Sequence, residues 1–220
     1  MNDSVIPDSR SLDARQLSVH QINQWLSELP PSVTTLDLIG GDKPDLLAPG
    51  FKNGCRLVIH GDLGDFCLCG VSNAEIEVKG LAGCGLGEAM ESGSILLSGD
   101  AGDAAGAFNR GGLVAIYGSA GRRTAVGMCG GDMVVKGSIG SQGAMGMTAG
   151  ALLILGSAGK MLGQGMHGGT IYIRGDTESL APHLEETRMR EADRLRISLL
   201  LLNSGIENEA RNFRVLKVGI

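Results

Sequence analysis

Short runs of alternating hydrophobic and polar positions recur between residues 57 and 175, and each run ends in a glycine. The runs read LVIHG, IEVKG, ILLSG, VAIYG, MVVKG, LLILG and IYIRG. The closing glycines stand 19 residues apart throughout and are Gly61, Gly80, Gly99, Gly118, Gly137, Gly156 and Gly175. A fixed period near 20 residues indicates a solenoid, in which each repeat packs only on its neighbours.

The alternation also defines which side of each run faces inward. Residues four and two places before the closing glycine are all aliphatic or Met, whereas the residue just before it is mostly polar. The inward residues are Leu57, Ile59, Ile76, Val78, Ile95, Leu97, Val114, Ile116, Met133, Val135, Leu152, Ile154, Ile171 and Ile173. This alternation is typical of a half-buried strand. One strand per repeat predicts an all-β fold, a right-handed parallel β-helix of about seven coils spaced about 4.8 Å apart.

Other positions of the repeat form rows of their own. Glycine recurs three places after the closing glycine and again before the next strand, where we expect positive φ or a crowded backbone. The mostly polar row directly after the closing glycine belongs at an outer corner, where side-chain oxygens bond turn amides. The row ten places after it comprises Met90, Asn109, Met128, Met147 and Met166. A row of methionines could bind a soft metal, but the favoured interpretation is that these side chains fill gaps in a narrow tube. The segment Phe108–Asn109–Arg110 is expected to form an outward loop.

The segment before the repeats, residues 1–50, is interpreted as a lead and a cap. Residues 1–16 resemble a loose lead, and Ser18 is a helix N-cap before an amphipathic helix that ends at Pro30–Pro31. Residues 33–42 are predicted to form a strand and a turn, in which Gly41–Asp42 resembles the Gly61–Asp62 corner of the repeats. A cap is expected there because an exposed first strand would be an edge prone to aggregation.

After the β-helix, assigned to residues 51–177, the composition changes. Residues 178–204 lack glycine and are rich in helix formers, so residues 178–220 are predicted to form a helix and a tail. One helix face is expected to hold Leu184, Ala192, Leu195, Leu199 and Leu202. This helix is either a cap on the last coil or a contact for another subunit, and both can hold. The strand-like tail either packs back or reaches a partner.

Composition and charge exclude several classes of function. The formal net charge of -5 over 220 residues argues against binding to nucleic acid or to an acidic membrane. No apolar stretch approaches the roughly 20 residues of a membrane span, and the polar start lacks the apolar region of a signal peptide. Five cysteines, an odd number, favour a reducing cytoplasm over a disulfide framework.

Side chains able to do chemistry do not converge in the predicted coils. The cysteines, Cys55, Cys67, Cys69, Cys84 and Cys129, occupy different repeat positions, and His167 shares the position of Cys129 only two coils away. They form no zinc or iron–sulfur ligand set. GCGLGE at residues 83–88 lacks room for the helix of a dinucleotide fold. Ser and His are too scattered for a nucleophilic triad. We therefore predict no catalytic, cofactor-binding or metal-binding residue in this chain.

The repeats resemble a known family. The segments GDLGDFCLCG, GLAGCGLGEAM, GDAGDAAGAFNRGG, GSAGRRTAVGMCGG, GSIGSQGAMGMTAGA and GSAGKMLGQGMHGG are similar to the glycine-rich (GXGXG) β-helix domain of the glutamate synthase large subunit, over residues 33–176. The tail, with LLNSGIENEARNF before VLKV, weakly resembles the closing segment of that domain. The same β-helix occurs in the C subunit of formylmethanofuran dehydrogenase.

The resemblance implies a function. The chain is similar to the free-standing β-helix subunit of glutamate synthase-like complexes such as N-methylglutamate synthase (methylamine–glutamate N-methyltransferase). By that resemblance it is a non-catalytic subunit that braces a glutaminase-like (amidotransferase) subunit and an FMN-binding synthase-like subunit, and FMN and an iron–sulfur cluster belong to a partner. The alternative is the equivalent subunit of a formylmethanofuran dehydrogenase or formyltransferase–hydrolase complex.

Overall fold

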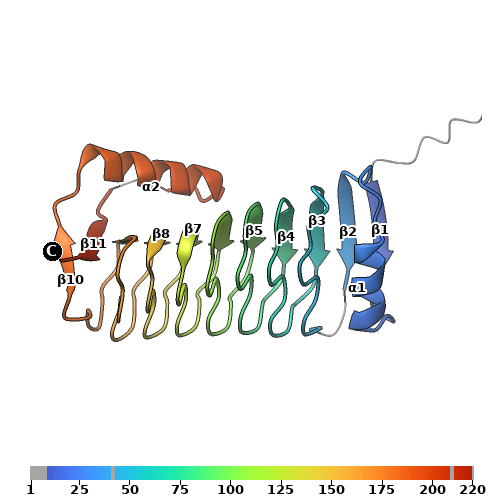
Figure 1. Ribbon diagram of the computed structural model, residues 1–220, viewed down its shortest axis with the longest axis horizontal. Helices are drawn as coiled ribbons and strands as arrows, with labels where there is room; N and C mark the ends of the chain where they lie inside the picture. The colour runs from blue at the N-terminus through green and yellow to red at the C-terminus, as the bar shows by residue number, and fades with distance from the viewer. Residues whose placement is uncertain (1–8, 41–42, 209–210, 220) are drawn as a thin grey trace, which may run out of the picture.

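The computed structural model describes residues 9–40, 43–208 and 211–219. It forms a parallel β-solenoid with two helices, which confirms the predicted fold class (Figure 1). The strands are β1 Ser9–Asp13, β2 Thr35–Ile39, β3 Arg56–His60, β4 Glu75–Lys79, β5 Ser94–Leu97, β6 Leu113–Ile116, β7 Cys129–Val135, β8 Ala149–Ile154, β9 Thr170–Ile173, β10 Leu184–Thr187 and β11 Arg214–Val218. The helices are α1 Val19–Ser27 and α2 Glu191–Asn203.

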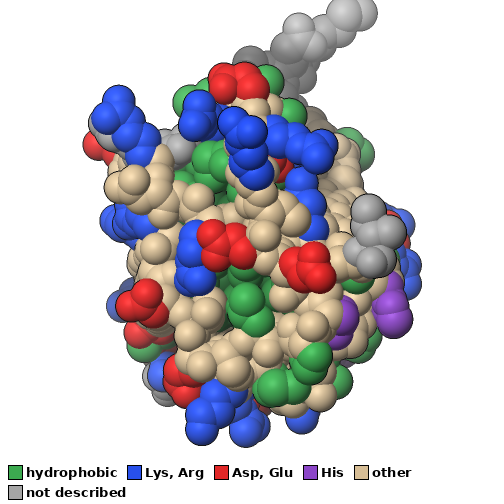
Figure 2. Space-filling model, turned by 90° about the vertical axis from the view of Figure 1, so that its left-hand side faces the viewer, with side chains coloured by type: hydrophobic (Ala, Val, Ile, Leu, Met, Phe, Trp, Pro, Cys, Tyr) green, Lys and Arg blue, Asp and Glu red, His purple; other side chains and the backbone are tan. Residues whose placement is uncertain are grey.

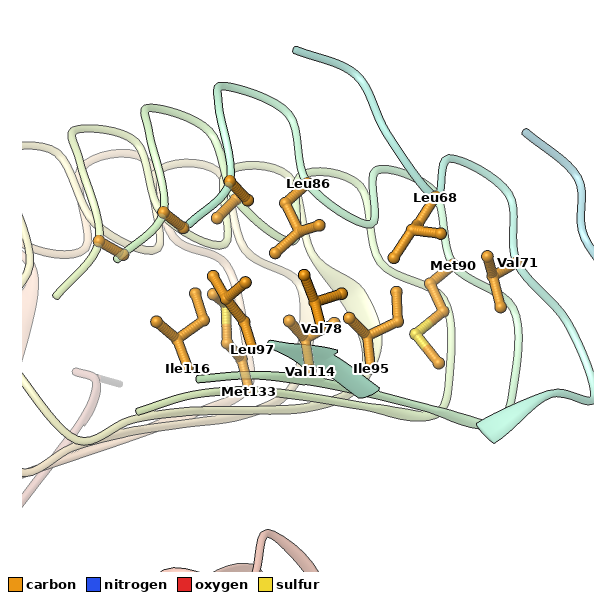
Figure 3. Close-up of a cluster of buried hydrophobic side chains, with 14 of the residues drawn as sticks. Leu68, Val71, Val78, Leu86, Met90, Ile95, Leu97, Val114, Ile116 and Met133 are labelled. Carbon is orange, nitrogen blue, oxygen red and sulfur yellow. The ribbon is translucent and has the colours of Figure 1, made fainter. Parts of the chain in front are cut away.

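The strands form one sheet in the order β1-β2-β3-β4-β5-β6-β7-β8-β9-β11-β10. Its first nine strands are parallel, and each regular coil pairs residues at the same repeat position, as in Leu57 with Ile76 and Ile76 with Ile95. All fourteen residues predicted to face inward are buried. Figure 3 shows Val78, Leu97 and Ile116 stacked from successive coils. A second ladder of parallel bridges joins the coils two places after the closing glycine, for example Ala82 to Ala101.

The glycine-rich stretch of each coil has a distinctive backbone. Positive φ recurs on alternate residues, five, seven and nine places after the closing glycine, as at Gly85 (69°), Gly87 (65°) and Ala89 (55°). Their amides bond in alternate directions: Gly85 N donates to Asp103 O of the next coil, and Gly87 N donates to Cys67 O of the preceding one. Glycine on alternate residues is favoured because it adopts positive φ without strain.

The corner glycines meet the second expectation, a crowded backbone. Gly140 does not have positive φ, but a Cβ there would lie 2.7 Å from the backbone N of Arg122 on the preceding coil. Real Cβ atoms do not approach backbone this closely. The corners therefore need glycine because adjacent coils pass too close for any side chain.

The row of methionines fills the tube, as predicted, with Met90, Met128, Met147 and Met166 all buried. Asn109 in the same row was expected in an outward loop, and that prediction is wrong: Asn109 is fully buried, while Phe108 is 52% exposed. Neither polar atom of the Asn109 side chain has a hydrogen-bond partner among the described residues. The residue ten places after each closing glycine points into the tube, so Asn109 is buried although it is polar. Its burial without hydrogen-bond partners costs stability.

The N-terminal cap is more ordered than the loose lead expected from the sequence. Residues 9–13 form β1, which pairs in parallel with β2. Ser18 caps α1 as predicted and forms a capping box with Gln21, and Ile22 and Leu26 are buried at the start of the stack. The strand predicted in residues 33–42 is β2, and the Gly41–Asp42 corner lies outside the described residues.

The C-terminal segment departs further from its prediction. α2 begins at Glu191, because residues 180–187 continue the solenoid through the Leu162–Leu180 bridge and then form β10. The tail packs back as β11, which pairs antiparallel with both β9 and β10. The reversed strand β11 ends the parallel stack, and the edge strand β10 presents exposed Glu185 and Glu186, charges that oppose edge pairing.

The face predicted for α2 is not the one that packs on the sheet. Leu184 lies in β10, and Leu195, Leu199 and Leu202, which share a helix face as predicted, are exposed. The structure instead buries Ile197, Leu200 and Leu201.

A first prediction concerns the corners. Gly140→Ala should destabilise the protein by about 3 kcal/mol or prevent soluble expression, because the backbone of the preceding coil must move. Gly146→Ala is the matched control: Gly146 has positive φ but open space around it, and Ala89 already occupies the same repeat position. It should cost about 1 kcal/mol. Equal losses in urea unfolding would contradict the crowding argument.

A second prediction concerns the buried amide. Asn109→Met should stabilise the protein by about 1 kcal/mol, because it removes an unpaired buried amide and completes the methionine row. The reverse change in the same row, Met128→Asn, should destabilise it by about 3 kcal/mol. Thermal and urea unfolding measure both. A clear loss of stability in Asn109→Met would show that the amide is satisfied by bound water.

Candidate functional site

The cysteines form no disulfide, and three of them are poorly suited to reaction. All five are free; Cys55 and Cys67 are buried, and Cys129 is exposed. Burial raises the pKa of the Cys55 and Cys67 thiols. Burial, helped by the charge of Glu88, raises the pKa of Cys69 to about 11. Because the thiolate is the nucleophile and the metal ligand, these three thiols are largely unreactive near neutral pH.

The histidines do not join the cysteines. His60 lies at an outward strand position, where its Nε2 is 2.7 Å from Asp37 Oδ1, and His167 is exposed. No group of three or more His, Cys, Asp or Glu side chains that could hold a metal ion occurs in the parts of the chain that the structure describes. The absence of a catalytic residue stays a prediction.

The polar rows at the outer corners are occupied by structural hydrogen bonds. Asp62 Oδ1 accepts from Leu81 N at 2.8 Å, Asp100 Oδ1 from Ser119 N at 2.6 Å, and Ser138 Oγ from Ser157 N at 3.0 Å. A second row, four places after the closing glycine, does the same through Asp65 and Asp103. These side chains join one coil to the next, as expected for the first row.

The outer face of the sheet under α2 forms a hydrophobic cluster of its own. Ile197, Leu200 and Leu201 of α2 and Phe213 and Val215 of the tail belong to a second hydrophobic cluster, separate from the tube interior. The sheet contributes the outward residues Ala115, Val134, Ala151, Leu153, Leu155 and Tyr172. α2 thus lies along the outer face of the later coils (Figure 1).

Polar contacts fix the position of α2 on that face. Asp193 is only 5% exposed, and its Oδ1 lies 3.2 Å from Lys217 Nζ on β11 and 3.3 Å from the Tyr172 hydroxyl on β9. Arg196 pairs with Asp132 on β7, and the Tyr117 hydroxyl donates to Ser204 O at 2.6 Å. Three strands, together with Tyr117 just after β6, therefore hold the helix and its C-cap by charged or polar groups.

The ionisation of these groups follows from their surroundings. Burial alone would raise the pKa of Asp193, but the backbone hydrogen bond from Arg190 and the Lys217 ammonium together hold it below its usual value. Burial, together with the neighbouring Asp193, raises the pKa of Tyr172 to about 12. Burial also raises the pKa of Asp132, although Arg196 acts against it.

The sequence carries a signal for this surface that alternation alone does not reveal. Three places before the closing glycine, an outward position, stand Val58, Glu77, Leu96, Ala115, Val134, Leu153 and Tyr172. From Leu96 onward this row is apolar, so the later coils are hydrophobic on both sides of the sheet. Such strands need a cover on their outer face.

The outside of α2 and the end of the solenoid carry exposed charge. Figure 2 views this end and shows Lys and Arg side chains gathered where α2 begins. Arg188, Arg190 and Arg194 are exposed there, and Arg194 lies 3.6 Å from Glu191. Neither helix among the described residues has the length and apolar content needed to cross a membrane.

Taken together, the geometry defines a glycine-rich parallel β-solenoid whose corner side chains join its coils and whose C-terminal helix covers one outer face. A family model of the GXGXG motif matches residues 47–198. The chain belongs to the GXGXG motif family. A comparison with curated proteins finds no match.

A third prediction tests the attachment of α2. Because the pKa of Asp193 is lowered in the folded protein, its stabilising effect is complete above the usual Asp value of about 4 and is lost as pH falls through the folded-state pKa. Asp193→Asn should cost about 2 kcal/mol at neutral pH, and the difference from the wild type should shrink at lower pH.

The control is Glu191→Gln on the exposed side of the same helix, which should have little effect. Urea unfolding of the three proteins across acidic and neutral pH measures both effects. A constant difference between wild type and Asp193→Asn down to the lowest pH would contradict this account.

Proposed function

We propose that the chain is a non-catalytic structural subunit of a glutamate synthase-like complex, in the manner of N-methylglutamate synthase. It braces a glutaminase-like subunit and an FMN-binding synthase-like subunit, and FMN and the iron–sulfur cluster reside in a partner. Membership of the GXGXG family, which is associated with glutamate synthase large subunits, supports this proposal.

The observation that carries the scaffold role is how the polar side chains of the repeats are used. Asp62, Asp65, Asp100 and Asp103 accept amide hydrogens from the following coil, so their oxygens stabilise the stack. Catalysis needs side chains that converge on one reacting atom. A row in which each group serves the next coil provides rigidity and a long surface for partners.

The thiols are consistent with the proposed cytoplasmic location. All five cysteines are free, as expected in a reducing compartment. The buried and high-pKa thiols act as small core side chains and need no redox role.

A fourth prediction tests this function. Purification of the native complex through a tag on this chain should recover a glutaminase-like chain and a flavoprotein with FMN absorbance, while the isolated chain should turn over no substrate. Single alanine changes at His60, Cys84, Cys129 and His167 should leave the activity of the assembled complex within a few-fold.

Two outcomes would overturn the proposal. Recovery of molybdenum or tungsten enzyme subunits would favour a formylmethanofuran dehydrogenase type of complex. Loss of activity in one of the four alanine variants, with assembly intact, would show that this chain contributes to catalysis.

A further inference from the structure

The outward side of α2 carries a stripe of leucines. Leu195 is 61% exposed, Leu199 41% and Leu202 74%. Their spacing of four and three residues places them on one line along the helix. Single exposed leucines are ordinary, but a contiguous stripe on a helix whose other side is already buried marks an interaction surface.

Most neighbours of the stripe are uncharged. Ala192, Ser198 and Asn203 are exposed beside it, and Arg196, three residues before Leu199, is paired with Asp132 on β7. The other charges lie at its two ends: Arg188 and Arg190 at the start of α2, with the Glu191–Arg194 pair, and Glu207 just beyond its end. The helix dipole has the same direction, positive at the arginine end and negative at the other.

We infer that the leucine stripe binds the same stripe of a second copy of this chain, with the two α2 helices antiparallel about a twofold axis. In that arrangement Leu195 faces Leu202 of the second copy, and Leu199 lies next to the axis. A twofold interface requires such a self-complementary patch.

Charge favours the antiparallel orientation and a second copy of this chain as the partner. The antiparallel arrangement places the arginine end of one α2 next to the Glu207 end of the other, and the two helix dipoles then point in opposite directions. A parallel pair would instead bring the arginine ends together. Because Glu191 is already paired with Arg194 at 3.6 Å, it adds little repulsion.

The size of the stripe limits the strength of association. α2 has 13 residues and is therefore about 20 Å long. A contact of that length falls among the small interfaces that associate weakly. The dimer should form reversibly with rising protein concentration, and it does not depend on the proposed function, because no other subunit is needed.

The test is sedimentation of the full chain from low to high micromolar concentration. The wild type should shift from monomer to dimer, whereas Leu195→Glu and Leu202→Glu should stay monomeric with unchanged circular dichroism. Leu81→Glu is the matched control, since Leu81 is 42% exposed and stands in a corner row where Asp62 and Asp100 already place carboxylates. It should dimerise like the wild type.

A crosslink tests the geometry. In a Cys129→Ser background, which removes the exposed native thiol, Leu199→Cys should form a disulfide-linked dimer under mild oxidation because the residue meets its own copy at the axis. Leu81→Cys in the same background should not. A wild-type chain that remains monomeric, a dimer equally weakened by Leu81→Glu, or a dimer without the Leu199→Cys crosslink would overturn the inference.

Discussion

Backbone hydrogen bonding between equal positions of successive coils is the constraint on which this structure depends. All residue pairs between successive strands from β3 to β7 join positions 19 places apart. An insertion in one coil would shift a whole strand by a residue and exchange its inner and outer faces. This explains why the period does not vary, and why the inner rows of the strands contain only aliphatic side chains and Met.

The same constraint governs the glycine-rich side. Three residues of each coil adopt positive φ in alternation, and their amides bond to the coil on either side in turn. Glycine is favoured there by conformation, yet Phe66, Arg123 and Gln142 also adopt it. At the corners, by contrast, glycine is required by space. The motif therefore contains glycines for two different physical reasons, positive φ and lack of space, which cannot be told apart from the sequence.

The C-terminal segment ends the stack and prepares a surface. β11 reverses direction, β10 closes the edge, and α2 covers the outward hydrophobic row of the later coils. Asp193, held as a carboxylate near Lys217 and Tyr172, fixes which side of α2 faces the sheet. Leu195, Leu199 and Leu202 then face solvent, because the polar contacts of Asp193 hold the opposite side of α2 against the sheet.

The sequence by itself determined the strands of the seven repeats, their register and the inner core, because in a parallel stack equal repeat position means spatial contact. It also determined the Ser18 cap, whose signal is local. Only the tertiary structure decided the fate of Asn109, since the register of its row outweighs the preference of one polar residue. It alone decided the orientation of α2, because Leu195, Leu199 and Leu202 compete with Ile197, Leu200 and Leu201 for the buried side. That choice depends on Asp132, Tyr172 and Lys217, which come from three different strands.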